Sequence, residues 1–319
     1  MLESLRQLDE IHLNFSQGSL FVLNLTLAFI MFGVALEIKL DSFKKLLLRP
    51  KPAIIGVISQ FFLLPAVTFL LIMIFKNFIT PTVALGMILV ASCPGGNISN
   101  FISSLAKGNI ALSVSLTAVA TLAAIFMTPL NFAFWGKLYT VYHNKASASA
   151  FLRPLEIDAG QMFQTVFILL GIPLLIGVWV AWKYPDLTRK IVNPIKRLSI
   201  LIFIGIVILA FSSNYDYFLQ HIKFIFIIVL IHNTIALTTG YVFSSIFKLK
   251  RSDRRSVTIE TGIQNSGLGL VLIFNPKIFP EHLAIGGMAF IAAWWGIWHI
   301  LSGLGIAWLW SRMPLKKDG

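Results

Sequence analysis

An apolar segment near residues 253–276 is interrupted at its centre by Thr258-Ile259-Glu260-Thr261-Gly262-Ile263-Gln264-Asn265-Ser266-Gly267. A second apolar segment, near residues 83–105, is interrupted by Ser92-Cys93-Pro94-Gly95-Gly96-Asn97-Ile98-Ser99-Asn100. A polar group at membrane depth costs several kcal/mol unless it faces protein, water or an ion. Two such interruptions therefore predict a ligand site, and helices broken near the middle of a bilayer are typical of secondary transporters.

The composition predicts an all-α integral membrane protein. Hydrophobic residues make up 57% of the 319 residues and charged residues only 12%, and the mean hydropathy is +0.82. A soluble domain has about 25% charged residues. Apolar spans close to or above the roughly 20 residues that cross a bilayer are predicted at 17–37, 51–75, 81–106, 109–136, 159–182, 198–213, 221–247, 253–276 and 284–311. We therefore expect about nine transmembrane helices.

Basic residues predict the orientation. The loops expected on one side contain 19 of the 26 Lys and Arg residues: Lys39, Lys44, Lys45, Arg49, Lys51, Lys107, Lys183, Arg189, Lys190, Lys196, Arg197, Lys248, Lys250, Arg251, Arg254, Arg255, Arg312, Lys316 and Lys317. The positive-inside rule places that side and the C-terminus in the cytoplasm and the N-terminus outside, in a plasma or bacterial inner membrane. The net charge of +13 is explained by these short loops and needs no nucleic acid partner. With Cys93 as the one cysteine, no multi-cysteine metal site is expected.

The chain divides into two halves at its longest polar connection, about residues 137–158. Each half has its interruption in the second-to-last apolar span. Transporters with inverted repeats place their site at such corresponding positions.

Glu260 is the one carboxylate well inside a span, and oxygen donors surround it in sequence: Thr258, Thr261, Gln264 and Asn265. A single carboxylate among neutral oxygens suits a monovalent cation such as sodium. A proton is the competing occupant, and an ion pair with Arg255 is the structural alternative.

Other polar residues are weaker candidates. Ser113 and Thr117 lie four apart, on one helix face, where such hydroxyls also serve as interhelical contacts. The same alternative applies to Gln60 and to the pair His232-Asn233. His299 and Ser302 lie three apart on the last span and are candidates for a cavity or for packing.

The break at Pro94-Gly95-Gly96 predicts the start of a new half-helix near Phe101, with Asn97 and Ser99 as N-caps. The glycines are expected there because they tolerate reversed backbone dihedrals. Half-helix N-termini carry positive dipole ends, which suit an anionic substrate such as a carboxylate or sulfonate.

Three segments together resemble the signatures of the bile acid:sodium symporter family: Pro94-Gly95-Gly96-Asn97-x-Ser99-Asn100, Gly108-Asn109-x-Ala111-Leu112-Ser113 and Glu260-Thr261-Gly262-x-Gln264-Asn265. Similar stretches run from Met31 to His299. The resemblance implies inverted repeats, two crossed discontinuous helices, and a core domain that moves against a panel domain. The family pattern has ten helices, and the nine predicted here are similar to its vertebrate bile acid members.

The resemblance also implies the ligands. Sodium site 1 would use Ser99, Asn100, Ser113, Thr117 and Glu260, and sodium site 2 would use Gln60, Glu260, Gln264 and carbonyls of Thr261 and Ile263. Substrate would contact Asn97, Asn265 and His299. The chain departs from some bacterial relatives at Ile300, where they carry asparagine.

On this pattern we expect the following division: an external tail at 1–16, the panel domain at 17–50 and 159–218, the core domain at 51–137 and 219–311 with breaks at 92–100 and 258–267, a connecting loop at 138–158, and a cytoplasmic tail at 312–319. The tail at 1–16 lacks the basic start of a signal peptide and is expected to remain uncleaved.

The predicted function is sodium-coupled import of an organic anion, first a bile acid-like molecule, with two sodium ions and no enzymatic activity. A small carboxylate such as pantoate or a keto acid is the alternative substrate, and a proton-coupled carrier using Glu260 is the alternative mechanism. An intramembrane hydrolase using His299 and Ser302 is a remote alternative, because no second acid and no glycine-framed serine support it.

Overall fold

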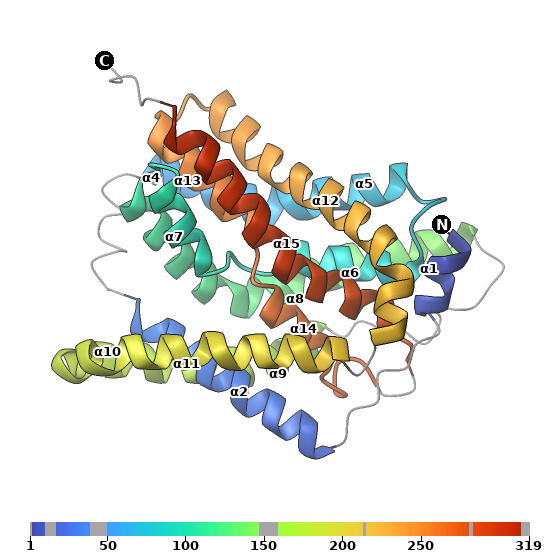
Figure 1. The fold of residues 1–319 in the computed structure, drawn as a ribbon, viewed down its shortest axis with the longest axis horizontal. Coiled ribbons are helices and arrows are strands. Elements are labelled where there is room, and N and C mark those ends of the chain that lie inside the picture. Colours follow the sequence, from blue (N-terminus) through green and yellow to red (C-terminus); the bar gives the residue numbers. More distant parts are fainter. Residues whose placement is uncertain are drawn as a thin grey trace.

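The computed structural model describes residues 2–9, 17–38, 50–146, 159–212, 215–280 and 283–313. Within these ranges the chain is helical (Figure 1), and its one β-bridge joins Gly95 to Gln264. The elements are α1 (Leu2–Asp9), α2 (Gln17–Leu36), α4 (Pro50–Ile58), η1 (Ser59–Leu63), α5 (Leu64–Ile74), α6 (Pro81–Ser92), α7 (Ile98–Leu105), α8 (Ile110–Ala146), α9 (Ala159–Val166), η2 (Phe167–Gly171), α10 (Ile172–Lys183), α11 (Pro185–Ser212), α12 (Tyr215–Ile246), α13 (Arg251–Gly262), α14 (Ser266–Ile273) and α15 (Gly286–Ser311).

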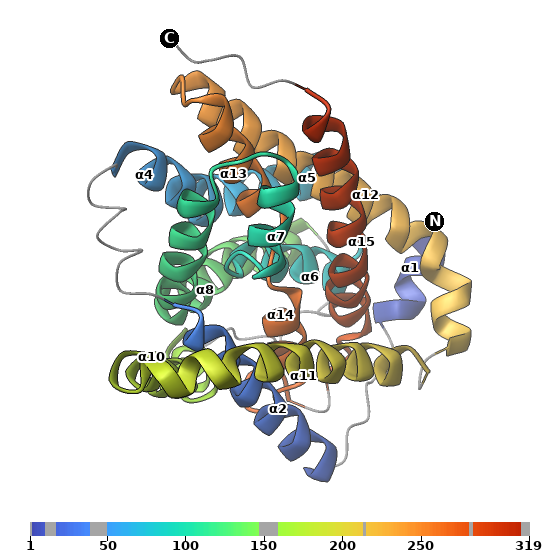
Figure 2. The same cartoon turned by 60° about the vertical axis from the view of Figure 1, so that its left-hand side comes forward.

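The helices form two groups. α2 packs against α10 and α11, and these three helices lie along one edge of the molecule in both views (Figures 1 and 2). On the other side, α6 packs against α8 and α15, and α12 packs against α13. The two broken segments, α6 with α7 and α13 with α14, belong to this second, larger group.

α6 is buried on all its faces. Every residue from Thr82 to Ser92 is buried, and the main apolar core runs from this helix to α14 and to the first half of α15. A helix that is hydrophobic all round belongs in the centre of a helical protein. The broken segment beginning at Pro81 is therefore held by packing on all sides.

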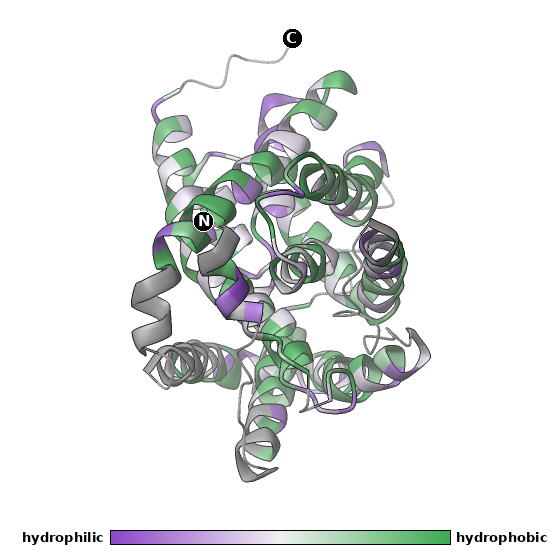
Figure 3. Ribbon diagram, turned by 90° about the vertical axis from the view of Figure 1, so that its right-hand side faces the viewer, coloured by the Kyte–Doolittle hydropathy of each residue, from purple (hydrophilic) through white to green (hydrophobic). Residues whose placement is uncertain are grey.

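In the described part of the chain, five helices are long and apolar enough to cross a membrane: Pro50–Ile74, Ile110–His143, Gly160–Lys183, Ile222–Ile246 and Gly286–Ser311. Apolar residues cover much of the helical surface in Figure 3. The two broken segments fall outside this group because each half is short. The count of nine spans stays a prediction.

Two of the five long helices contain a π-helical turn just before a proline. In the first, η1 precedes Pro65, and in the second, η2 precedes Pro173. Proline has no N–H, so Pro65 leaves the carbonyl of Phe61 without its α-helical donor. The side chain of Asn131, on α8, donates to that carbonyl at 2.9 Å. The turn that carries Gln60 is thereby fixed to a neighbouring helix.

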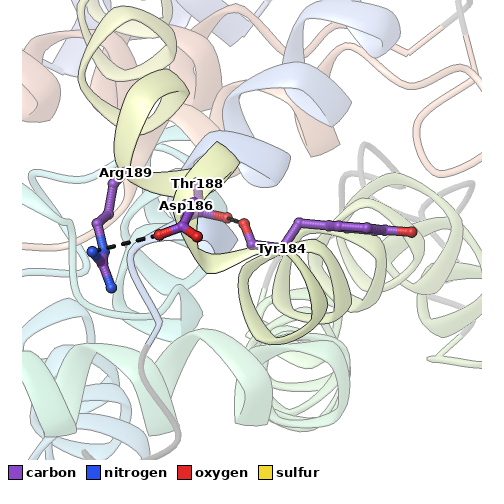
Figure 4. Close-up of polar contacts among 4 residues, drawn as sticks. All are labelled: Tyr184, Asp186, Thr188 and Arg189. Atoms are coloured by element: carbon purple, nitrogen blue, oxygen red, sulfur yellow. Dashed lines mark hydrogen bonds and ion pairs between the residues drawn. The ribbon is translucent and has the colours of Figure 1, made fainter.

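The turn between α10 and α11 consists of Tyr184 alone (Figure 4). The Thr188 hydroxyl donates to the carbonyl of Tyr184 at 3.0 Å, which closes the corner. Arg189 lies 3.5 Å from Asp186, but both side chains are about four-fifths exposed or more. Such a surface ion pair adds little stability, so the corner depends on the contact between Thr188 and the Tyr184 carbonyl.

Two regions differ from the sequence prediction. The predicted connecting loop at 138–158 begins later, because α8 continues to Ala146. The predicted external tail at 1–16 contains α1, in which Leu5 is fully buried. The apolar side chain of Leu5 and a buried acidic residue hold this short helix against the larger group.

Asp9 is that acidic residue, and it joins α1 to the start of α6. Its carboxylate accepts hydrogen bonds from the Thr80 hydroxyl at 2.9 Å, from the Thr82 main-chain N–H at 3.3 Å and from the Thr82 hydroxyl. A carboxylate at a helix N-terminus is favourable for the free N–H groups and for the dipole. Burial nevertheless raises the pKa of Asp9 above its ordinary value of 3.8, although the threonine hydrogen bonds oppose this shift.

Candidate functional site

The two helix breaks cross each other as extended backbone. The main-chain N–H of Gly96 donates to the carbonyl of Ile263 at 2.7 Å, and the N–H of Asn265 donates to the carbonyl of Pro94 at 2.7 Å. The antiparallel bridge between Gly95 and Gln264 lies between these bonds. The non-helical residues lie between Ser92 and Ile98 and between Gly262 and Ser266, inside the predicted breaks at 92–100 and 258–267.

The glycines are needed for close approach and not for reversed dihedrals. No glycine among the described residues has a positive φ, so the expectation from backbone freedom was wrong. A side chain at Gly95 would overlap the Glu260 carboxylate, and one at Gly96 would lie 3.3 Å from the carbonyl of Gln264. Hydrogen at these positions lets the two segments cross beside the carboxylate without displacing it.

The second half-helix of the first break starts earlier than predicted. α7 begins at Ile98 and not near Phe101, and Asn97 occupies the N-cap position without a side-chain capping bond. In the other break, the Asn265 side chain does cap α14 by accepting from the N–H of Leu268 at 3.1 Å. Both half-helix N-termini thus lie next to the crossing.

Glu260 lies at the centre of the crossing and is 1% exposed. Ser99 donates to its Oε2 at 2.6 Å and Thr117 donates to its Oε1 at 2.8 Å. Arg255, the sequence alternative for an ion pair, donates instead to the carbonyls of Ala106 and Met313, at 2.8 and 3.3 Å. The carboxylate is therefore surrounded by hydroxyl groups.

The remaining residues predicted for site 1 converge on the same place. Asn100 Oδ1 accepts from Ser113 at 2.9 Å and from Thr117 at 3.1 Å. Ser113 also contacts the hydroxyl of Ser103 at 3.1 Å. Four side chains from α7 and α8, with Glu260 from α13, make one cluster of oxygen atoms. This is the donor set that hard monovalent cations prefer.

The side chains predicted for site 2 come from two residues close to Gly95. Gln60 is 1% exposed and Gln264 is fully buried. A Cβ at Gly95 would overlap Glu260 Oε1 and lie 3.1 Å from Gln60 Nε2, so both side chains flank this glycine. Both amide atoms of Gln60 and Oε1 of Gln264 lack a hydrogen-bond partner among the described residues. Buried polar atoms are nearly always satisfied, so these orphaned oxygens fit a place that receives a cation.

The carbonyls at the end of α13 each have one hydrogen-bond donor. Gln264 Nε2 donates to the carbonyl of Thr261 at 2.7 Å, Asn233 Nδ2 donates to that of Gly262 at 2.7 Å, and Gly96 donates to that of Ile263. A carbonyl oxygen has two lone pairs, so the Thr261 and Ile263 carbonyls keep one for a further ligand.

The three residues predicted for substrate differ in exposure. Asn97 and Asn265 are half-buried at the starts of the two half-helices. His299 is 5% exposed on α15, one turn before Gly303, where a Cβ would lie 2.9 Å from Ile102 and Ile263. All three therefore lie around the crossing, with His299 packed more deeply than the two asparagines.

The hydrolase alternative lacks the required contact. The Ser302 hydroxyl donates to Asn233 Oδ1 at 2.6 Å and to the main-chain carbonyl of His299 at 3.1 Å. Its partner is not the imidazole, so no activated nucleophile is formed.

Several polar residues of the crossing escaped the sequence reasoning. Ser59 contacts the Thr261 hydroxyl at 2.9 Å, and Ser103 contacts Ser113. Asn131 fixes the π-helical turn, and Asn233, which the sequence singled out without a partner, binds the end of α13. Each is a small polar residue inside an apolar span, a signal that marks buried hydrogen bonds but does not name their partners.

An all-helical chain with apolar spans, in which two broken helices cross at a buried carboxylate, has the architecture of a secondary transporter. Known proteins agree with this class. The Sodium Bile acid symporter family matches residues 24–221, and the chain belongs to that family. The protein is therefore an integral membrane transporter of a sodium-dependent family, and not an enzyme.

Individual relatives cover most of the chain. An uncharacterized sodium-dependent transporter of Bacillus subtilis, YocS, is 33% identical over 96% of this chain and 89% of its own length. The human hepatic sodium/bile acid cotransporter is 28% identical over 93% of this chain and 82% of its own. The human P3 protein is 29% identical over 82% of this chain, which spans only about half (52%) of that relative.

Proposed function

We propose that the protein is a symporter that imports an organic anion together with two sodium ions. The observation that supports this most is the buried Glu260 carboxylate, which accepts hydrogen bonds from hydroxyl groups and has no basic partner among the described residues. A carboxylate in this position needs a cation to balance its charge at membrane depth.

Site 1 is assigned to the hydroxyl cluster. Ser99, Ser113 and Thr117 supply hydroxyl oxygens, Asn100 supplies an amide oxygen and Glu260 supplies one charged oxygen. Their mutual hydrogen bonds, at 2.6 to 3.1 Å, support the assignment because the donors already converge. A sodium ion would take the oxygen lone pairs while the hydroxyl hydrogens turn away.

Site 2 is assigned to the place beside Gly95 where the side-chain amides of Gln60 and Gln264 lie. Its ligands would be Gln60, Gln264, Glu260 again, and the carbonyls of Thr261 and Ile263. The orphaned amide oxygens support this assignment. Because one carboxylate serves both sites, the first sodium ion would neutralise the negative charge that attracts the second. The two ions and the carboxylate would together carry a net charge of +1.

That net charge favours an anionic substrate. Two sodium ions and one carboxylate sum to +1, and the N-termini of α7 and α14 add their positive dipole ends at the same place. Asn97, Asn265 and His299 would contact the substrate. A bile acid-like molecule is our first choice, in keeping with the human hepatic relative. A small carboxylate such as pantoate or a keto acid is the second.

Transport would proceed by alternating access. The larger helix group, with both breaks, would be the core domain, and the group of α2, α10 and α11, with α9 joined to α10, would be the panel domain. Sodium would stabilise the crossing in one state, and bound substrate would permit the core domain to move against the panel domain. Each ligand can drive this change only through different affinities for the two states.

Uptake into proteoliposomes tests the proposal. We expect an inward sodium gradient to drive accumulation of radiolabelled taurocholate or, for the second choice, pantoate or pyruvate, and matched potassium to drive none. Accumulation driven by a proton gradient in the absence of sodium would overturn sodium coupling and favour the proton-coupled alternative.

The orientation has a separate test. We propose that the C-terminus is cytoplasmic, with the loop between α12 and α13 on the same side. Cys93 is buried, so Lys250→Cys provides one reactive thiol in that loop. A membrane-impermeant maleimide should label it in inside-out vesicles and not in intact cells. The reverse pattern would contradict the orientation.

A further inference from the structure

One carbonyl at the end of α13 accepts its hydrogen bond from a side chain outside the crossing. A helix leaves its last carbonyls without intrahelical donors. At this end, Thr261 and Ile263 obtain donors from the crossing itself, from Gln264 and Gly96. Gly262 lies between them, and its carbonyl receives Asn233 Nδ2, from α12, at 2.7 Å.

Asn233 is itself fixed in orientation. Its Oδ1 accepts from the Ser302 hydroxyl, on α15, at 2.6 Å. Asn233 is fully buried, and its amide donates on one side and accepts on the other. A reversed amide would place its NH₂ group against the Ser302 hydroxyl and its oxygen against the Gly262 carbonyl, which leaves the carbonyl without a donor. The Gly262 carbonyl therefore determines which way the Asn233 amide points, and the Ser302 hydroxyl holds the amide oxygen in that orientation.

The peptide plane of Gly262 determines where its neighbours' carbonyls point. A peptide unit is planar, so only φ and ψ relate one carbonyl to the next. Fixing the Gly262 carbonyl toward α12 therefore restricts the directions of the Thr261 and Ile263 carbonyls on either side. These two carbonyls are the main-chain ligands assigned to site 2.

We propose that Asn233 and Ser302 are positioning residues for the second sodium ion. They contact neither the carboxylate nor the amide ligands, and they act by aligning the carbonyls at the end of α13. Ser302 also bonds the carbonyl of His299, so the same pair ties the site to the helix that faces the substrate. This inference rests on the proposed sodium function.

A purely structural role makes a different prediction. Polar contacts between membrane helices contribute modestly to stability wherever they occur. If the pair were only such a contact, its loss would lower the melting temperature without changing the response to sodium. The Thr68 hydroxyl offers a matched control, because it bonds His232 Nε2 at 2.9 Å, one residue from Asn233, and belongs to neither sodium site.

The test is a sodium titration of thermal stability in detergent. Potassium replaces sodium at constant ionic strength, and no organic anion substrate is added. Ser302→Ala should raise the half-saturating sodium concentration about threefold to tenfold, as expected for one misaligned hydrogen-bond network. Ser302→Thr keeps the hydroxyl and should restore the wild-type value. Thr68→Val should lower the melting temperature in potassium and leave the half-saturating concentration unchanged.

A double-mutant cycle identifies the site through which Ser302 acts. In a Gln60→Ala background, where the second site is already weakened, Ser302→Ala should add little. In a Ser113→Ala background, which alters the first site, its full effect should persist. Equal effects in both backgrounds, or a Ser302→Ala variant with the sodium response of Thr68→Val, would overturn the inference. A wild-type protein that sodium does not stabilise would instead refute the proposed function.

Discussion

Gly95→Ala places one methyl group against the carboxylate that the two proposed sodium sites share. The new Cβ would overlap Glu260 Oε1, approach the carboxylate carbon to 2.9 Å and lie 3.1 Å from Gln60 Nε2. The backbone there is bridged to Gln264, so the glutamate has to move. Overpacking of a buried site costs about 1–3 kcal/mol, which corresponds to about fivefold to 150-fold in an equilibrium constant. We expect the half-saturating sodium concentration to rise by that factor.

Gly269→Ala is the matched control. Gly269 lies in α14, and a Cβ there would be in ordinary contact, 3.6 Å from Cys93 Sγ and 4.0 Å from Ala292 Cβ. A glycine to alanine change in a helix is otherwise mildly stabilising, by about 0.4–1 kcal/mol. The assay is the sodium titration of melting temperature in purified protein. If Gly95→Ala matches Gly269→Ala in sodium response, Glu260 in this position does not ligate sodium.

Three further predictions concern ions and protons. Ser113→Ala and Thr117→Ala should raise the sodium concentration for half-maximal uptake more than they lower expression, whereas equal uptake curves would assign both hydroxyls to packing. Transport of a monovalent anion with two sodium ions moves one positive charge inward. An inside-negative potential of about 100 mV, worth about 2.3 kcal/mol, should therefore raise accumulation roughly fiftyfold. If accumulation does not change with a voltage set by potassium and valinomycin, one sodium ion accompanies each anion. Burial raises the pKa of Asp9, so its contribution to stability is greatest below its ordinary pKa and is lost as pH rises through the raised value. Asp9→Asn should remove this loss, and a wild-type pH profile of melting temperature in that variant would contradict it.

The helix breaks could be predicted from the sequence because few polar groups are tolerated inside an apolar span. Glu260 and the hydroxyl residues near Ser99 all need polar partners inside the protein, and the structure brings them together. The same argument singled out Gln60 and Gln264 as polar residues inside apolar spans, whereas their grouping in one site came from the family resemblance. It worked because the cost of an unpaired polar group at membrane depth acts on each residue separately.

Other features depend on contacts between helices, which spacing along the chain does not reveal. Nothing in the sequence shows that Pro65 frees a carbonyl for Asn131, or that Asn233 reaches the end of α13. The reason for the glycine at position 95 was also misjudged, because its backbone dihedrals are ordinary and its neighbour is the carboxylate. Such reasons appear only when the crossing itself is known.

The central claim is that one carboxylate binds the sodium that drives transport, and Glu260→Gln tests it most directly. The change keeps the size of the side chain and removes the carboxylate charge from the crossing. Sodium at 100 times its dissociation constant stabilises a single-site protein by about 2.7 kcal/mol, so the wild-type melting temperature should climb with sodium and not with potassium. We predict that Glu260→Gln folds with a similar melting temperature in potassium and shows no rise at sodium concentrations that saturate the wild type. A wild-type rise in Glu260→Gln would contradict the account.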